Sequence, residues 1–195
     1  MKKVILLVVA IMATVSISQA QTVQEDQVKS EIKTVSKKDP KAKTEKKNLR
    51  MELRKLEGQD VSAATKDQFM TDFRNFSNAK WSRSGYYDQA TFMKNGASST
   101  AFYDSKSQLV GTTTHKKFSD LPANAQKIIN DKYKGYTKGD VLYYDDNEEN
   151  DTDMVLFDRQ FDDADNYFVE VSKDGKNSVL QVAKNGEVSN FTTLQ

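Results

Sequence analysis

The chain has 195 residues, of which 37% are apolar and 29% are charged, and its formal net charge at pH 7 is +1. It contains no cysteine, which excludes disulfides, thiolate metal sites and thiol nucleophiles. Its single histidine, His115, has no second histidine with which to form a metal site or a catalytic pair. The composition predicts a globular protein whose stability comes from its core.

Residues 1–20 have the pattern of a signal peptide. Lys2 and Lys3 precede an apolar run over residues 4–15, and Ser18-Gln19-Ala20 is a small-x-small cleavage site. The run is shorter than the roughly 20 apolar residues that a membrane-spanning helix needs. We therefore expect an exported product, periplasmic or secreted, without a transmembrane segment.

A charged arm with a short helix is expected over residues 21–60. Residues 29–55 contain eleven lysines and arginines against four acidic residues, a net charge of +7. Residues 21–43 show no apolar periodicity and predict disorder, whereas Leu49, Leu53 and Leu56, followed by Gly58, predict a helix between residues 44 and 57. Such an arm could bind anionic lipid or peptidoglycan, but a solvated linker is favoured, and the lack of interleaved aromatic residues argues against nucleic acid.

Repeat unit 1 is expected over residues 61–117. Thr65-Lys66-Asp67-Gln68 has the form of a capping box, and Phe69, Phe73 and Phe76 line one face of the helix that it predicts. The periodicity then becomes two. Four antiparallel strands follow, at 79–83, 86–93, 98–104 and 109–116, and Asn95-Gly96 is a strong hairpin signal.

Repeat unit 2 is expected over residues 118–195. Ser119-Asp120-Leu121-Pro122 predicts the start of a helix that runs to Tyr133 and stops at Gly135. Its strands are predicted at 138–144, 166–173, 178–183 and 187–193, with turns at Asp174-Gly175 and Asn185-Gly186.

Two segments of unit 1 recur in unit 2. Phe73-Arg74-Asn75-Phe76 returns sixty residues later as Tyr133-Lys134-Gly135-Tyr136, and Lys94-Asn95-Gly96 returns seventy-nine residues later as Lys173-Asp174-Gly175. The offset grows by 19 residues, which places an insertion between the helix and the hairpin of the second copy. The predicted fold class is α+β: two tandem units, each a helix packed on a four-stranded antiparallel sheet, preceded by a disordered or helical basic arm.

Aligning the copies sorts the strand residues by face. Eight positions are apolar or aromatic in both copies and are predicted to pack under the helices: Ala90, Phe92, Ala101, Tyr103, Val169, Val171, Leu180 and Val182. The opposite face is mixed, and it supplies the candidate partner-binding residues Tyr87, Phe102, Phe168 and Val179. The alternative is that these are ordinary scattered surface residues.

The insertion, residues 145–165, contains ten acidic residues against Arg159, a net charge of −9. Read as an EF-hand loop from Asp145, it has Asn150 at the glycine position and Leu156 at the bidentate acid position, so it fails that template. Weak calcium binding stays open, but a solvated hairpin tip is favoured and no metal site is predicted.

Catalytic motifs are missing from the sequence: it has no nucleophile elbow, no His-Glu-x-x-His pair, no phosphate-binding glycine loop and no dinucleotide fingerprint. A pair of carboxylates brought together by the fold is the one arrangement that the sequence leaves open. We therefore predict no enzymatic activity, no catalytic residue and no cofactor.

An ordered series of weak motifs resembles the PepSY-like family with a β-lactamase-inhibitor-protein-like tandem-repeat fold. The series comprises Asn78-Ala79-Lys80-Trp81, Tyr86-Tyr87, Asn95-Gly96, Phe102-Tyr103-Asp104, Leu121-Pro122 and Gly135-Tyr136. The resemblance covers residues 65–195 and departs at Asp104-Ser105-Lys106-Ser107, where the family has Asp-x-x-Gly, and at the acidic insertion. In the inhibitor that gives the fold its name, the concave sheet face grips an enzyme.

Two functions remain open from the sequence. The leading hypothesis is a non-enzymatic exported binding module, an inhibitor or ligand-capturing protein, that uses its sheet face to bind a protein or peptide of the cell envelope. The alternative is an envelope structural or stress protein that its basic arm holds to anionic surfaces.

Overall fold

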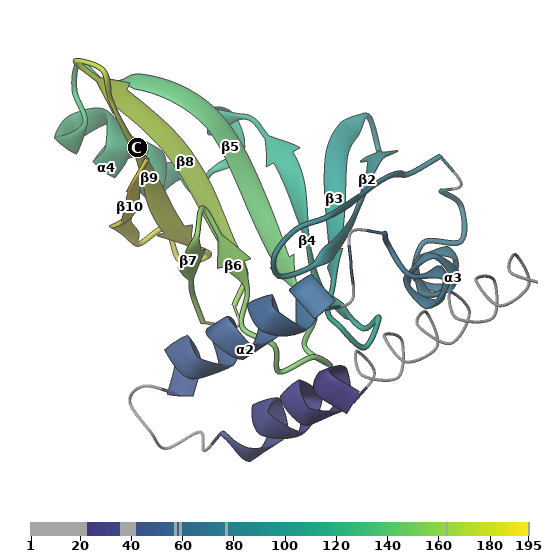
Figure 1. Ribbon diagram of the computed structural model, residues 1–195. Coiled ribbons are helices and arrows are strands. Elements are labelled where there is room, and N and C mark those ends of the chain that lie inside the picture. The colour runs from purple at the N-terminus through teal and green to yellow at the C-terminus, as the bar shows by residue number, and fades with distance from the viewer. Residues whose placement is uncertain are drawn as a thin grey trace, which may run out of the picture. The chain divides into compact units, whose positions relative to one another are not determined.

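The computed structural model describes residues 23–35, 42–56, 58, 60–76, 78–162 and 164–194 (Figure 1). The chain divides into two compact units: the arm unit, up to Asp60 together with Arg83–Tyr87, and the body, Val61–Ser82 together with Asp88 onwards. The predicted signal peptide lies outside the described residues. Within those residues, no helix is both long enough and apolar enough to cross a membrane.

The arm unit is more helical than its sequence predicts. Residues 23–34 form a helix, so the prediction of disorder is wrong for this stretch. Val28, Ile32 and Val35 lie at helical spacing, and Val28 is buried. The Glu25–Lys29 ion pair, at 3.6 Å, adds support between neighbouring turns of the helix.

The second helix of the arm unit is α2 (Ala42–Leu56), which confirms the helix predicted between residues 44 and 57. Leu53 is fully buried. Gly58 has φ +81°, the conformation that glycine adopts readily beyond a helix end, as its predicted role as a stop requires.

The body is built on one eight-stranded sheet in the order β1-β2-β3-β4-β5-β8-β9-β10. The eight strands match the eight predicted ones: β1 (Lys80–Arg83), β2 (Asp88–Lys94), β3 (Ala97–Tyr103), β4 (Leu109–Lys116), β5 (Thr137–Asp146), β8 (Asn166–Lys173), β9 (Lys176–Ala183) and β10 (Val188–Leu194). Antiparallel pairing of β4 with β5 joins the two copies, with Thr113 opposite Tyr144. The tandem units therefore share a single continuous sheet.

Helix α3 (Ala63–Asp72) starts differently from the prediction. Ser62 is the N-cap, and its hydroxyl accepts the Thr65 amide at 3.0 Å. The predicted capping box at Thr65 is therefore wrong. The Thr65 hydroxyl is buried and donates to the Asp88 carboxylate at 2.9 Å, which ties the first turn of α3 to the start of β2.

The start of the second helix also differs from the prediction. Ser119 lies in the 3-10 turn η1 (Phe118–Asp120), and Pro122 occupies the N-cap position of α4 (Ala123–Lys132), so the predicted cap is wrong. The predicted end is confirmed, since Tyr133 is the C-cap and Gly135 has φ +81°.

The helix-side core consists of two clusters that repeat the same plan. One contains Phe69 of α3 and the other Ile129 of α4, and all eight of the strand positions predicted from the alignment of the copies lie in these clusters. Phe73 and Phe76 follow the last residue of α3, yet their rings pack on Phe92 with centroid distances of 4.9 and 5.0 Å. The predicted aromatic face therefore exists, although the helix is shorter than expected.

The insertion forms a small hairpin of its own, β6 (Val155–Leu156) with β7 (Arg159–Gln160). Glu148, Glu149 and Asp151 are exposed, as expected of a solvated tip. Met154, Val155 and Phe161 are buried, so that expectation is wrong for the apolar part of the insertion. Among the described residues, no group of histidines and acidic residues could hold a metal ion.

Candidate functional site

Five aromatic residues gather on the sheet face opposite α4, and we call them the aromatic face: Tyr144, Phe157, Phe161, Phe168 and Phe191. Phe168 is central, with ring centroids 5.0 Å from Phe161 and 4.9 Å from Phe191. Tyr144 lies 5.1 Å from Phe161 in an edge-to-face arrangement, the geometry that aromatic pairs prefer. The cluster joins β5, β8, β10 and the insertion.

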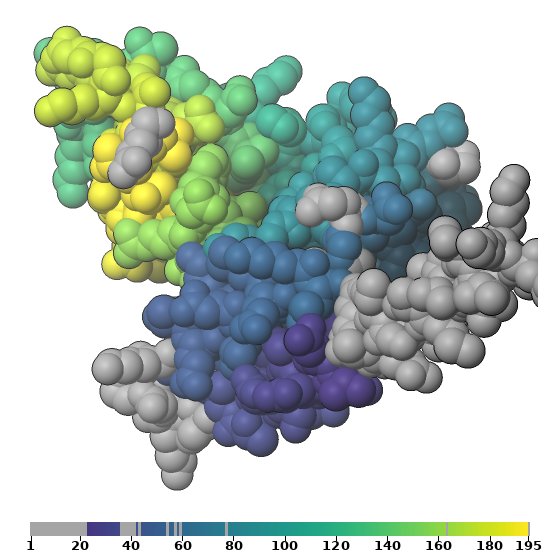
Figure 2. All heavy atoms as spheres, viewed as in Figure 1, coloured from purple at the N-terminus to yellow at the C-terminus, as the bar shows by residue number. Residues whose placement is uncertain are grey.

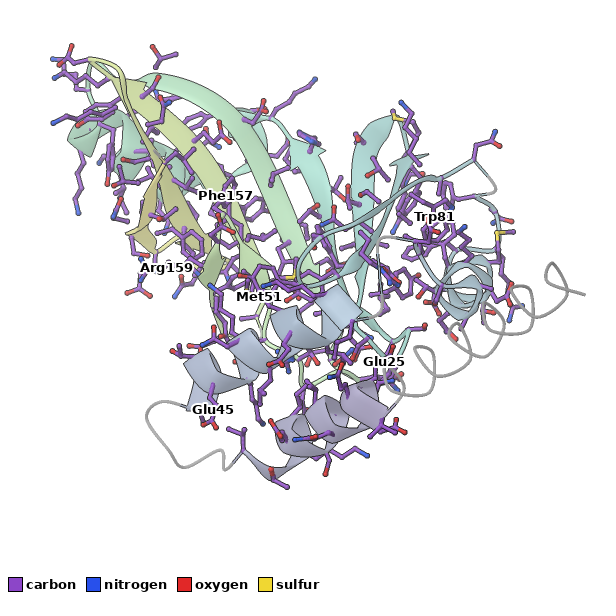
Figure 3. All side chains as sticks on the ribbon, viewed as in Figure 1. Glu25, Glu45, Met51, Trp81, Phe157 and Arg159 are labelled. Atoms are coloured by element: carbon purple, nitrogen blue, oxygen red, sulfur yellow. The ribbon has the colours of Figure 1, made fainter. Side chains whose placement is uncertain are left out.

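Strand alternation assigns this face. Val169 and Val171 pack in the α4 cluster, so Phe168, the residue before Val169, points to the other side of the sheet. Figure 1 shows the β6–β7 hairpin in front of the sheet and α4 behind it. Figure 3 shows Phe157 and Arg159 on that hairpin, beside β8 and β10.

Gly111 on β4 makes room for Tyr144. A Cβ atom at position 111 would lie 2.6 Å from Cε2 and from the hydroxyl of Tyr144. The Tyr144 hydroxyl donates to the Val110 carbonyl at 3.3 Å or to the Asp146 carboxylate at 2.9 Å, which fixes the ring over the glycine. Phe102 is the β3 partner of Gly111, so it lies on the same side of the sheet.

The structure buries all four residues of the predicted partner-binding face. Their exposed fractions are 2% for Tyr87, 6% for Phe102, 1% for Phe168 and 0% for Val179. The interpretation of these side chains as surface residues is therefore wrong. For Phe168 the cause is clear, because Phe157 and Phe161 of the insertion pack against it. Tyr87 belongs to the arm unit, whereas the other three belong to the body.

Asp165 anchors the C-terminal end of the insertion. Its carboxylate accepts the Tyr143 hydroxyl at 3.0 Å and the Asp146 amide at 2.9 Å, and it pairs with Lys184. Burial by itself raises the pKa of Asp165, but these three donors outweigh it and hold the pKa below its ordinary value. Burial and the bond to Asp165 raise the pKa of Tyr143. The anchor is therefore a hydrogen-bonded carboxylate that stays ionised.

The helix side of the body carries a cleft of about 490 Å³ near the end of α3. Phe73, Lys94, Leu109, Thr112 and Asp145 are among its lining residues. Burial and the Asp165 carboxylate raise the pKa of Asp145, and Lys94 opposes the rise. The Lys94 ammonium also lies 5.8 Å from the centre of the Phe73 ring, so the cleft already contains a cation of the chain itself.

The single histidine, His115, is not among the residues that line the cleft. His115 is exposed near the end of β4, where it pairs with Leu142. The carboxylates that line the cleft share it with Lys94 and with amide side chains.

Sequence reasoning missed five residues of the site: Tyr144, Phe157, Arg159, Phe161 and Phe191. The Arg159 guanidinium donates to the Phe191 carbonyl and lies 5.3 Å from the centre of the Phe191 ring. A signal was available, since Phe157 and Phe161 are the two aromatic residues inside an otherwise acidic insertion. Aromatic residues in a charged segment indicate that it packs on something.

No family model matches the sequence, and no curated protein matches it either. Solved structures do match the fold. A DUF2874 family protein from Bacteroides uniformis has a TM-score of 0.55 and 16% identity, over 67% of this chain and 90% of that chain. A BLIP-like protein from Bacteroides fragilis has a TM-score of 0.52 and 19% identity, over 68% and 88%.

A third similar structure is that of a Bacteroides eggerthii protein proposed to be periplasmic, with a TM-score of 0.55 and 14% identity, over 68% of this chain and 91% of that chain. The predicted β-lactamase-inhibitor-like fold is thus confirmed, while membership of the PepSY-like family stays a prediction. The chain has the α+β fold of the DUF2874 and BLIP-like proteins, and at these identities the likeness concerns the fold alone.

Proposed function

We propose that the chain is a non-enzymatic exported binding module that captures a protein or peptide of the cell envelope through its aromatic face and the adjoining edge of β10. Phe168 and Val179 lie buried beneath this surface, and Phe102 is buried on the same side of the sheet toward the first copy. The accessible groups are the partly exposed Phe157 and the exposed Arg159 and Ser189. An inhibitory role is one form that such capture could take.

One observation carries the proposal: aromatic side chains are concentrated on one face of the sheet, beside its edge strand β10. Aromatic residues dominate the energetics of protein interfaces because each buries a large area with few rotatable bonds. β10 is the last strand of the sheet, and an edge strand can accept an extended partner through its backbone. The resemblance to a BLIP-like fold supports a binding role, and the predicted signal peptide supports export.

The test uses the lack of native cysteines. Ser189 and Asn190 are adjacent and exposed on β10 but point to opposite faces, since Ser189 pairs with Gln181 and Asn190 with the core residue Leu180. A single cysteine at either position, labelled with a photo-crosslinker, reports on one face. Lys127, exposed on α4, is a distant control.

We expect an envelope extract of the exporting cell to yield a cross-linked partner from position 189 and none from positions 190 and 127. The substitutions are on the surface, so each labelled protein should keep the native fold. Equal cross-linking from all three positions would contradict the proposal, because it would show that capture does not use the aromatic side of the sheet.

A further inference from the structure

The turn of the β6–β7 hairpin begins with a bulky residue at positive φ. Phe157 and Asp158 have φ values of +50° and +58°, whereas the other tight hairpins of the body use Asn95-Gly96 and Asp174-Gly175. A bulky residue at positive φ is strained, and such strain persists only where surrounding contacts enforce it. Here the Phe157 ring meets Phe168 and Phe191, with centroid distances of 6.2 and 6.5 Å.

The same hairpin also forms a hydrogen bond with the backbone of the edge strand β10. Phe191 is the extra residue at the irregularity of β10 between Asn190 and Thr192, and its carbonyl accepts the Arg159 guanidinium. In Figure 2 the yellow-green insertion lies directly against yellow β10. Phe157 therefore packs on the aromatic rings of the sheet, and Arg159 bonds to a backbone carbonyl of the edge strand.

We propose that the β6–β7 hairpin is an intramolecular plug, and that the surface beneath it accepts a turn-forming peptide segment with an aromatic residue and, two positions later, an arginine. This inference rests on the proposed function, since it names the partner's chemistry at that surface. The plug shows which side chains the surface accepts, because the chain's own Phe157 and Arg159 occupy it.

The plug is displaceable because its ends are held independently of its tip. Before the hairpin, the side-chain amides of Asn147 and Asn150 donate to the Leu109 carbonyl at 2.7 and 2.9 Å. After the hairpin, Asp165 is held by its three donors. The strands of the plug are only two residues long, so few ladder bonds are lost when the tip leaves. The apparent affinity of the chain for an added peptide is then proportional to the fraction of molecules in which the plug is open.

The test measures binding of a fluorescent peptide with the sequence of residues 154–161 to the full chain. The opened variant is Phe157→Ser/Arg159→Ser. The closed variant is Asp158→Gly, which removes the strain of positive φ at that position, and Asp158→Asn is its control because it removes the same charge but keeps a side chain. A peptide with serine at both key positions controls for nonspecific binding.

We expect the opened variant to bind the peptide at least tenfold more tightly than the wild type, and Asp158→Gly to bind it more weakly than Asp158→Asn. The serine peptide should bind none of them. Equal affinity for all the variants, or no binding to a folded opened variant at millimolar peptide, would overturn the plug.

Hydrogen exchange on the wild type keeps the inference testable if the opened variant does not fold. The Phe161 amide, which bonds to the Met154 carbonyl at 3.0 Å, should exchange through a local opening that low urea does not accelerate. Exchange only with the amides of β8 and β9 would overturn the plug. The cross-linking experiment tests the proposed function separately. If the peptide binds but no envelope partner is cross-linked, the proposed function is refuted and the plug is not.

Discussion

Replacing Gly111 with alanine tests whether the aromatic face is rigidly packed. The new Cβ would lie 2.6 Å from Cε2 and the hydroxyl and 2.7 Å from Cζ of Tyr144, about 1 Å inside optimal carbon contact. Tyr144 is fully buried and hydrogen-bonded, so it cannot swing away without losing contacts. Overpacking of this kind costs about 1–3 kcal/mol. The lower entropy of an alanine-containing unfolded chain returns about 0.4–1 kcal/mol.

We therefore expect Gly111→Ala to lower the free energy of unfolding by about 1–2 kcal/mol, measured by urea denaturation with an unchanged m-value. Gly85→Ala is the matched control, because no atom lies within 4 Å of its added Cβ and its φ is not positive. That variant should be neutral or slightly stabilised. In the background Tyr144→Leu the cost of Gly111→Ala should shrink, and a coupling near zero in this double-mutant cycle would refute the steric reasoning.

Three further predictions follow from contacts of the body and from the arm. Burial and the carboxylates of Asp72 and Asp165 raise the pKa values of Tyr103 and Tyr143 above the ordinary 10.0, so both hydroxyls ionise first in the unfolded chain. The free energy of unfolding should therefore fall as the pH rises above 10. Tyr103→Phe and Tyr143→Phe should each flatten that decline in urea titrations at alkaline pH. Ser107 has φ +61° and its hydroxyl lies 2.8 Å from that of Thr65, so Ser107→Ala should be less stable than Ser107→Gly by roughly 1 kcal/mol in thermal melts, and equal stabilities would contradict the strain. Deleting residues 21–57 should abolish binding to anionic vesicles at low salt without changing the cross-link at Ser189; loss of that cross-link would favour the alternative in which the arm carries the function.

The helix-side core was predictable because two copies constrain each other. Ala90 is too small to define a face by itself, but its counterpart Val169 is unambiguous, and both lie in helix-side clusters. The tight turns were equally predictable from the sequence, since Asn95-Gly96 and Asp174-Gly175 adopt the positive φ values that a tight turn requires. Helix starts were not, because Ser62 and Thr65 both offer a hydroxyl, and the tertiary bond to Asp88 decided which of them caps.

The aromatic face escaped prediction for a different physical reason. The 19-residue difference in offset located the insertion between β5 and β8, but strands of two residues are too short to produce a period of two. The turn between them lacks glycine and asparagine, so no local signal marks it. Beyond its short ladder, the hairpin is stabilised by long-range ring contacts with Phe168 and Phe191, and a single sequence does not show them.

The two copies also show why the second became the candidate site. The loop between β1 and β2 spans only residues 84–87, where Ser84 caps a tight turn by accepting the Tyr87 amide at 3.0 Å. The corresponding loop between β5 and β8 contains a hairpin whose rings complete an aromatic cluster. On β2 the side of the strand away from the helix carries Gln89 and Thr91, whereas on β8 the same side carries Phe168. The insertion and the aromatic cluster that it completes therefore occur in the same copy, as expected if the insertion and the surface that it covers act as a unit.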